Sequence, residues 1–234
     1  MAIQLLGKRG TSHAEDELPA RKKHGAADPT QQSALRVHHT VVESALLSVW
    51  VRLPEEWEPV AAVAHDWTNE ALNLRYSVPG QEKVLWDVYM VSLSIAKTAP
   101  DPSAYRVGVC MGDGREQGIM IAIINRCQNR AGYDFSTVEI KWLTTRSHNL
   151  CPDIEGRFTG VGRSLVEHAR SLAKEEGIAY LVVSPLGRAR GFYERCGFMD
   201  IGDFGARYNL HDLRGGSMAA FAEPSTPEMS ITHS

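Results

Sequence analysis

The sequence has little of several features that would narrow the class of protein. It contains only four cysteines in 234 residues, and their spacing fits neither a zinc site nor a disulfide framework. No apolar run reaches the length of a membrane span, and residues 1–6 lack the long apolar core of a signal peptide. These absences predict a cytoplasmic protein with no structural metal and no membrane partner.

A strong charge of either sign is also missing. The chain carries 25 Lys and Arg against 28 Asp and Glu, a formal net charge of −3. This balance gives no electrostatic case for nucleic acid or an anionic membrane surface. The basic cluster at residues 21–24 follows an acidic run at residues 15–17. It fits either a basic targeting signal or nucleic-acid-binding arm, or part of a solvated flexible tail. Its shortness favours the tail. No nucleic-acid partner is therefore expected.

The composition is that of a globular protein with polar ends. Apolar residues make up 43% of the chain and charged residues 23%. Residues 1–36 are polar with little apolar periodicity, which predicts a flexible N-terminal extension. Residues 213–234 turn to Gly, Ser, Pro and Thr and are expected to form a disordered C-terminal tail. The folded domain is predicted over residues 37–212.

Two helices are expected early in this domain. Apolar residues recur at helical spacing over residues 55–74 and again over residues 84–95. Residues 39–53 are apolar and partly β-branched, and they fit either a first strand or a helix. The aromatics Trp57, Trp67, Trp86 and Tyr89 lie on the two helices. They could line a binding site, although aromatic residues at helical spacing are more often core.

Strand patterns follow the helices. Residues 105–111 and 117–125 alternate around Gly112-Asp113-Gly114-Arg115, and Asp-Gly between such segments predicts a β-hairpin. Residues 137–145 alternate and are rich in β-branched and aromatic residues, as in a third strand. Residues 199–202 and 206–210 are candidates for one or two short strands. The order predicts an α/β (α+β) fold with one mixed, twisted, mostly antiparallel sheet flanked by helices.

The stretch from Arg157 to Phe198 carries the clearest signal. Apolar residues four, four and three apart predict a helix that starts near Val161 and stops at Gly177. A buried strand over residues 179–183 and a short helix over residues 191–198 should follow. The turn Arg157-x-x-Gly160-x-Gly162 precedes the first helix. A glycine-rich helix start aims unpaired backbone N–H groups at one point, which suits a phosphate, although it can also be an ordinary helix start.

This arrangement resembles the GNAT-type N-acetyltransferase superfamily. The resemblance rests on strand, Arg157-x-x-Gly160-x-Gly162, helix, strand and Ala189-x-x-Phe192-Tyr193-x-x-x-Gly197-Phe198, and it is specific over residues 137–198. Two departures stand out. The asparagine often found seven residues before the tyrosine is Leu186 here, and the loop before Arg157 is long.

The resemblance implies acetyl-coenzyme A as co-substrate and no metal. The turn would hold the pyrophosphate, and the strand before it would bind the thioester carbonyl and pantetheine arm. The implied coenzyme residues are Leu143, Thr144, Thr145, Arg157, Phe158, Thr159, Gly160, Val161, Gly162, Arg163 and Ser164.

The resemblance also implies two catalytic residues. Tyr193 would protonate the departing thiolate, the alternative being a core tyrosine that anchors the last helix. Glu139 would take the amine proton, the alternative being a solvent-facing strand glutamate. Cys196 has no identifiable base beside it and is expected to be a small buried residue. Arg188 and Arg190 fit either coenzyme phosphates or solvated helix charges, and the sequence does not decide between them.

The expected function is transfer of an acetyl group from acetyl-coenzyme A directly to a primary amine. The acceptor is a small molecule or a protein lysine or N-terminus, and a homodimer is left open. The alternative is an inactive module of the same fold that binds acyl-coenzyme A or serves in regulation or interaction.

Overall fold

The computed structural model describes residues 46–51, 55–98, 104–128, 132, 134–208, 213 and 216–223. The chain divides into two units, Met1–Val42 and Glu43–Ser234, and every described residue lies in the second. The predicted N-terminal extension therefore lies outside the described residues. The strands are β1 Leu47–Trp50, β2 Tyr105–Gly112, β3 Arg115–Gln128, β4 Asp134–Thr145, β5 Tyr180–Val183, β6 Met199–Asp200 and β7 Met218–Phe221. The α-helices are α1 Trp57–Arg75, α2 Glu82–Lys97, α3 Val161–Glu175, α4 Arg190–Arg195 and α5 Ile201–Tyr208, with 3-10 turns η2 Ser147–Leu150 and η3 Gly187–Ala189.

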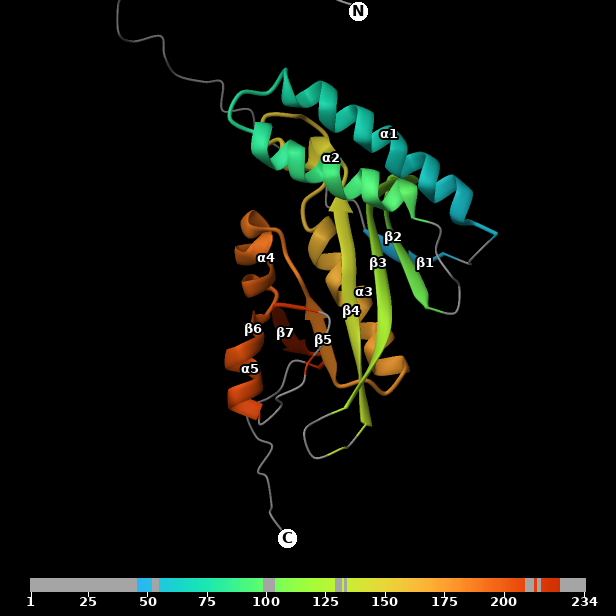
Figure 1. The fold of residues 1–234 in the computed structure, drawn as a ribbon. Coiled ribbons are helices and arrows are strands. Elements are labelled where there is room, and N and C mark those ends of the chain that lie inside the picture. Colours follow the sequence, from blue (N-terminus) through green and yellow to red (C-terminus); the bar gives the residue numbers. More distant parts are fainter. Residues whose placement is uncertain are drawn as a thin grey trace, which may run out of the picture. The chain divides into compact units, whose positions relative to one another are not determined.

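The strands form one seven-stranded sheet in the order β1-β2-β3-β4-β5-β7-β6 (Figure 1). Every neighbouring pair is antiparallel except β4 and β5, which are parallel and are connected through α3. A parallel pair needs such a crossover, because its strands cannot be joined by a tight turn. The predicted α/β class with a mixed, mostly antiparallel sheet is confirmed.

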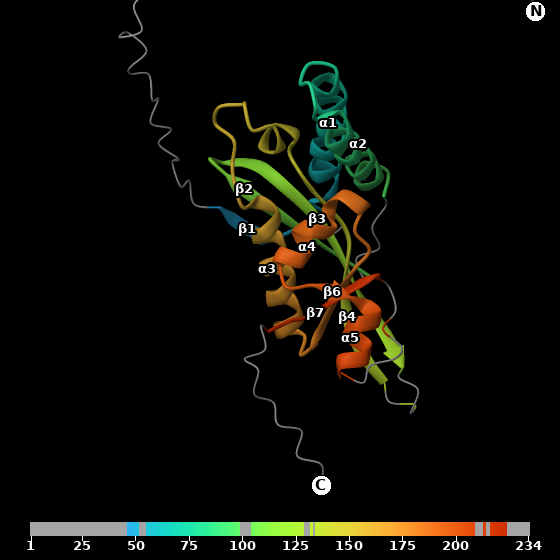
Figure 2. The same ribbon diagram turned by 90° about the vertical axis from the view of Figure 1, so that its left-hand side faces the viewer.

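Helices α1 and α2 pack together against one face of the sheet. In α1 the buried residues Val60, Ala64, Trp67 and Ala71 repeat every three or four positions, which makes one apolar stripe. Val60, Ala64 and Trp67 of that stripe pack with strand residues of β2 and β3 in a single cluster. Both predicted helices are confirmed, and they lie side by side in Figures 1 and 2. No described helix is long and apolar enough to cross a bilayer.

The four aromatics of these helices divide into two kinds. Trp67 is 4% exposed and is a core residue, and Trp57 packs against the same cluster. Trp86 and Tyr89 stack on each other at the surface with ring centroids 4.9 Å apart, and Trp86 is 40% exposed. Arg75 lies 4.7 Å from the centre of the Trp86 ring.

The opposite face of the sheet is covered by α3. Its residues Val161, Leu165, Ala169 and Leu172 are buried with residues of β3, β4 and β5. Figure 2 places α3 on the side of the sheet away from α1 and α2. The helix ends before Gly177, whose φ of 66° lies in the left-handed region that glycine tolerates. The helix and its stop are therefore as predicted.

The hairpin of β2 and β3 is confirmed. Asp113 and Gly114 have φ of 49° and 70°, the pair of positive values that a tight two-residue hairpin turn requires. The register of the pair shifts between Cys110 and Met111, and the shift leaves Gln117 as an extra residue on β3. Of the ambiguous segment 39–53, Leu47–Trp50 is strand β1, while residues 39–45 and 52–53 lie outside the described part of the chain.

Of the two candidate strands near the C-terminus, the first is confirmed in part, since Met199–Asp200 is strand β6, and the second is wrong. Residues 201–208 are helix α5 and not a strand: Phe204 and Gly205 are buried, while Ala206, Arg207 and Tyr208 are exposed, as on a helix with one buried face. The boundary at residue 212 is too early, since β7 at Met218–Phe221 pairs with both β5 and β6. Met218 and Ala219 are fully buried there. This segment is a strand of the sheet between β5 and β6, although its composition alone is typical of a tail.

Candidate functional site

The sheet opens between β4 and β5. The two strands pair only from Thr137–Tyr180 to Ile140–Val183, although β4 continues to Thr145. The opening starts at a bulge, because the β3–β4 register shifts at Ile121/Ala122 and leaves Lys141 unopposed. A bulge bends its strand and increases the local twist. The β4 edge from Lys141 to Thr145 is therefore turned away from β5, which sequence could not show.

The predicted strand residues Leu143, Thr144 and Thr145 lie on this open edge. Leu143 packs against the α3 side of the core. Thr144 is 4% exposed and its hydroxyl donates to the Thr145 carbonyl at 3.4 Å. The Thr145 hydroxyl is buried with no hydrogen-bond partner. A buried hydroxyl with no partner is uncommon in folded proteins, and a polar ligand bound along this strand edge would pair it.

The glycine turn lies at the start of α3, as predicted. Gly160 caps the helix with φ of 80°, and the first helical bond runs from Ser164 N–H to the Gly160 carbonyl at 2.8 Å. The N–H groups of Val161, Gly162 and Arg163 precede that bond, so the helix pattern leaves them available for an anion. Arg163 is exposed at the same turn, which adds positive charge.

Some of the predicted coenzyme residues of the turn already use their polar groups within the protein. Ser164 directs its hydroxyl to Ser48 Oγ of β1 at 2.9 Å, and its N–H is used within the helix. The Phe158 N–H is donated to Asn149 Oδ1 at 2.8 Å. A Cβ on Gly162 would lie 3.1 Å from the Phe192 ring of α4, so this glycine permits close packing of α3 and α4. Arg157 and Thr159 are exposed.

Tyr193 is positioned by α4 within the α3-side core. It is 5% exposed and makes edge contacts with Phe192 and Phe198 at 4.9 and 5.4 Å between ring centres. Burial, and secondarily Cys196, raises the pKa of the Tyr193 phenol well above its usual value of 10. The phenol therefore remains protonated at neutral pH, which is the form that a proton donor needs. Burial also raises the pKa of the Cys196 thiol, which disfavours a nucleophilic thiolate.

Glu139 is held on β4 by two donors. It is 5% exposed, accepts a hydrogen bond from Asn125 Nδ2 at 2.7 Å and forms an ion pair with Lys141 Nζ at 3.4 Å. It is thus not a solvent-facing glutamate, and its carboxylate oxygens are fixed near the bulge where β4 leaves β5. Its cross-strand neighbour Val182 belongs to the cluster packed under α5.

Residues 155–198 match the acetyltransferase (GNAT) family. The resemblance to the GNAT superfamily is confirmed. The matched segment, called the GNAT segment below, spans the glycine turn, α3, β5 and α4 with Tyr193. Glu139 and the open edge of β4 precede it.

Several solved GNAT-type structures are similar to the chain at low identity. Tetrahymena GCN5 is 14% identical with a TM-score of 0.44, over 77% of this chain and 98% of that one. An acetyltransferase from Vibrio fischeri is 16% identical with a TM-score of 0.38, over 58% and 93%. A predicted acetyltransferase from Clostridium acetobutylicum, solved with acetyl-CoA, is 12% identical with a TM-score of 0.40, over 66% and 90%. No curated protein matches the chain.

The two arginines near the end of the GNAT segment are paired with carboxylates. Arg188 forms two hydrogen bonds of 2.8 Å with Asp87 and one of 3.0 Å with the Lys83 carbonyl, which joins η3 to α2. Arg190 bonds Glu194 at 3.1 Å and Asp200 at 3.4 Å. Both guanidinium groups are therefore already paired with carboxylates of the protein. Leu186, at the usual asparagine position, is 45% exposed.

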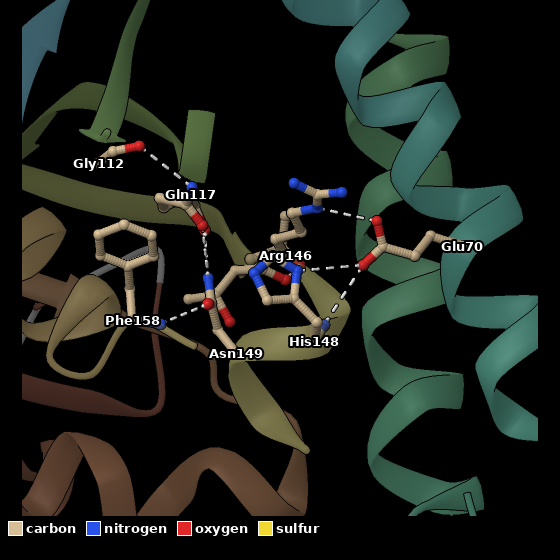
Figure 3. A network of polar contacts seen from close by, with 9 residues as sticks. Glu70, Gly112, Gln117, Arg146, His148, Asn149 and Phe158 are labelled. Atoms are coloured by element: carbon tan, nitrogen blue, oxygen red, sulfur yellow. Dashed lines mark hydrogen bonds and ion pairs between the residues drawn. The ribbon is translucent and has the colours of Figure 1, made fainter. Parts of the chain in front are cut away.

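Sequence reasoning missed a polar network beside the GNAT segment. Asn149, 7% exposed, and Gln117, 2% exposed, bond to each other at 3.0 Å (Figure 3). Arg146 and His148 of the same loop both contact Glu70 of α1. A polar cavity of about 350 Å³ adjoins the network, lined by Gly112, Asp113, Arg115, Gln117, Arg146, His148, Gly156 and Phe158. No spacing signal could have found contacts between residues so far apart in sequence.

No group of three metal-ligating side chains occurs among the residues that the structure describes. His148 and Cys151, which are three residues apart, have no second pair beside them. The absence of a metal stays a prediction.

Proposed function

We propose that this protein is an N-acetyltransferase that transfers an acetyl group from acetyl-coenzyme A directly to a primary amine. The acceptor would be a small molecule or a protein lysine or N-terminus. The observation that carries the proposal is the open edge of β4 beside the start of α3. A Cβ added to Gly162 would lie 3.8 Å from Leu143 of that edge and 3.1 Å from Phe192, the residue before Tyr193. A cytoplasmic setting belongs to the same proposal and is supported by four cysteines that are all free.

Coenzyme binding would use backbone donors at two places. The N–H groups at the start of α3, with Arg157 and Arg163, would hold the pyrophosphate. The open edge of β4 around Leu143 and Thr144 would bind the thioester carbonyl and stabilise the charge that develops on its oxygen. The Thr145 hydroxyl, which is buried and has no hydrogen-bond partner, would be paired by a polar group of the bound pantetheine arm.

The reaction would form one C–N bond and break one C–S bond. The amine nitrogen attacks the carbonyl carbon, and the thiolate leaves with the electron pair of the C–S bond. Glu139 takes the proton from the amine, directly or through water, while Tyr193 donates a proton to the sulfur. Proton return to Tyr193 is favoured, because a buried phenolate is costly and its conjugate phenol has a raised pKa.

One specific observation favours the alternative of an inactive module that binds acyl-coenzyme A. Leu186 replaces the asparagine that the superfamily commonly has at this position, which removes one polar contact for the coenzyme. Such a module would keep the start of α3 and have no use for the Tyr193 proton.

The test is amine-dependent release of free coenzyme A thiol from acetyl-coenzyme A, measured over a panel of amines with the wild type and Tyr193→Phe. An enzyme should lose about 10²-fold in kcat with the phenylalanine variant while coenzyme affinity is kept. Tyr180→Phe on β5 is the matched control, because this tyrosine also lies among aromatic rings but on the α5 side. A wild type that binds coenzyme but releases no thiol with any amine would favour the binding module.

A further inference from the structure

The long loop between β4 and the GNAT segment is anchored inside the fold by Asn149. This residue follows two buried or half-buried positions of η2 and is itself 7% exposed. Its Nδ2 donates to Gln117 Oε1 at 3.0 Å and to the Gln117 carbonyl at 3.4 Å. Its Oδ1 accepts the N–H of Phe158 at 2.8 Å. One buried amide thus joins the middle of the loop to the residue that follows Arg157.

Gln117 supplies the fixed end of this link. It is the extra residue at the β2–β3 register shift, and the bulge is where a strand can turn a polar side chain out of the normal alternation. Its Nε2 donates to the Gly112 carbonyl at 3.3 Å, and its own carbonyl accepts Arg146 N–H at 2.9 Å. Figure 3 shows this chain of bonds running from Gly112 through Gln117 and Asn149 to Phe158.

The side chain of Phe158 is fixed by the same hairpin. Its ring lies against the backbone of Gly112, where an added Cβ would be 2.6 Å from the nearest ring atom. Both the N–H and the ring of Phe158 are therefore held by residues of the hairpin or the loop. Phe158 lies two residues before Gly160, so the path of the glycine turn is set at this point.

The loop is also tied to α1. Glu70 accepts Arg146 Nε at 2.9 Å and the His148 N–H at 3.3 Å, with His148 Nδ1 3.5 Å away. Burial raises the pKa of Glu70, but hydrogen bonds from His148 and Arg146 outweigh it, so the net pKa is lowered. These contacts keep the residues on either side of Ser147 in place, and Asn149 follows them directly.

We propose that Asn149 is a positioning residue that sets the glycine turn through its bond to the Phe158 N–H, an inference that rests on the proposed coenzyme site. A neutral amide suits this task, because it can accept from Phe158 and donate to Gln117 at the same time. Asn149 has no direct contact with the coenzyme in this scheme, and its effect is carried by the backbone of the turn.

The first readout needs no coenzyme. Amide hydrogen exchange at Phe158 should be about tenfold or more faster in Asn149→Leu than in the wild type, because the N–H loses its buried acceptor. Asn149→Asp keeps an oxygen facing that N–H but loses the donor to Gln117, so exchange at Phe158 should be slower than in Asn149→Leu. Should the leucine variant fail to fold, Asn149→Ala removes the same acceptor without a branched side chain. Unchanged exchange at Phe158 would overturn the inference.

The second readout is acetyl-coenzyme A affinity by calorimetry. Asn149→Leu should raise the Kd about tenfold, the cost of misplacing one buried hydrogen-bonded turn. Asn149→Asp, which keeps the acceptor for Phe158 but not the donor to Gln117, should bind more tightly than Asn149→Leu. Thr68→Val, which removes a buried 2.9 Å bond within α1, is the control for loss of a buried hydrogen bond elsewhere and should bind as the wild type does.

The outcomes separate the two proposals. Faster exchange at Phe158 with an unchanged Kd in Asn149→Leu would overturn the positioning role and leave the coenzyme site standing. A folded wild type that does not bind acetyl-coenzyme A would overturn both. Should the Phe158 N–H stay protected in Asn149→Asp while affinity falls as far as in Asn149→Leu, the bond to Phe158 would not be what carries the effect, and the inference would also be overturned.

Discussion

Glu139 of β4 and Tyr193 of α4 lie on opposite faces of the sheet. Tyr193 shares a cluster with Val138 and Ile140, the neighbours of Glu139 along the strand, and alternate residues of a strand point to opposite faces. A closed sheet would separate the two groups. In the proposed reaction, the base on one face and the acid on the other would meet beyond Ile140, where β4 is no longer paired with β5.

Glu139→Gln tests the base. The glutamine keeps the size of the side chain but cannot accept the amine proton, so kcat should fall about 10²-fold with little change in coenzyme Kd. Initial rates of thiol release at saturating acetyl-coenzyme A give the comparison. Glu116→Gln on β3 is the control, since it is also a strand glutamate and should leave kcat unchanged. Full activity in Glu139→Gln would mean that this carboxylate is only a structural partner of Asn125.

The exposed arginines should differ in their effect on the coenzyme. Arg163→Ala removes a cation from the turn and should weaken binding several-fold, with the difference shrinking as salt is added. Arg188→Ala should change the coenzyme Kd little, because this guanidinium is already paired with Asp87. Calorimetry at two salt concentrations distinguishes the two. A larger loss with Arg188→Ala would assign the phosphate contact to η3 instead.

Acid should destabilise the protein through His168. This residue of α3 stacks on Trp50 of β1 at 4.0 Å, and its Nε2 is buried with no partner. Burial lowers its pKa below the usual 6.5, against smaller opposing effects of Glu175 and the Val49 backbone. The unfolded chain therefore takes up a proton that the folded state resists, so stability is lost as the pH falls below 6.5.

The check is the melting temperature of the wild type and His168→Phe from about pH 8 down to about pH 5. The phenylalanine variant should lose most of the decline, whereas His65→Phe at an exposed site on α1 should decline as the wild type does. Parallel curves for wild type and His168→Phe would rule out this histidine as the cause.

The C-terminal strand should be part of the folded unit. Truncation after residue 212 removes β7 with its buried Met218, Ala219 and Ala220 and should cost more than about 3 kcal/mol of unfolding free energy. Truncation after Glu223 keeps every described contact and should be neutral. Gly216→Ala is a finer test, because its Cβ would lie 2.7 Å from the Val183 backbone nitrogen. Denaturant titration of the three variants gives the result, and a stable protein ending at residue 212 would contradict it.

Local patterns in the sequence predicted the elements that depend on local chemistry. The Asp113-Gly114 turn, the stripe of α3 and the stop at Gly177 each follow from residues close in sequence. The C-terminal segment was missed because a short helix and a strand of small residues acquire their structure from what they pack against. The same is true of the Gln117–Asn149 pair, whose members are 32 positions apart and meet only in the fold.

The site shows the same division. The turn is recognisable from its glycine spacing, and the resemblance to the GNAT superfamily implies Tyr193 and Glu139. The structure places the three at the start of α3, on α4 and on β4. The opening of β4 from β5 could not be predicted, because it depends on an unopposed residue, Lys141, that only the pairing register reveals.

The most direct measurement is calorimetric titration of acetyl-coenzyme A into the wild type, Gly160→Trp and Gly177→Trp. Both glycines have positive φ, of 80° and 66°, and neither has a neighbour within 4 Å of an added Cβ, so the two substitutions strain the ends of α3 alike. We predict wild-type binding on the order of micromolar Kd, loss of at least about tenfold in Gly160→Trp and little change in Gly177→Trp. A folded wild type that does not bind, or equal losses in both variants, would contradict a coenzyme site at the start of α3.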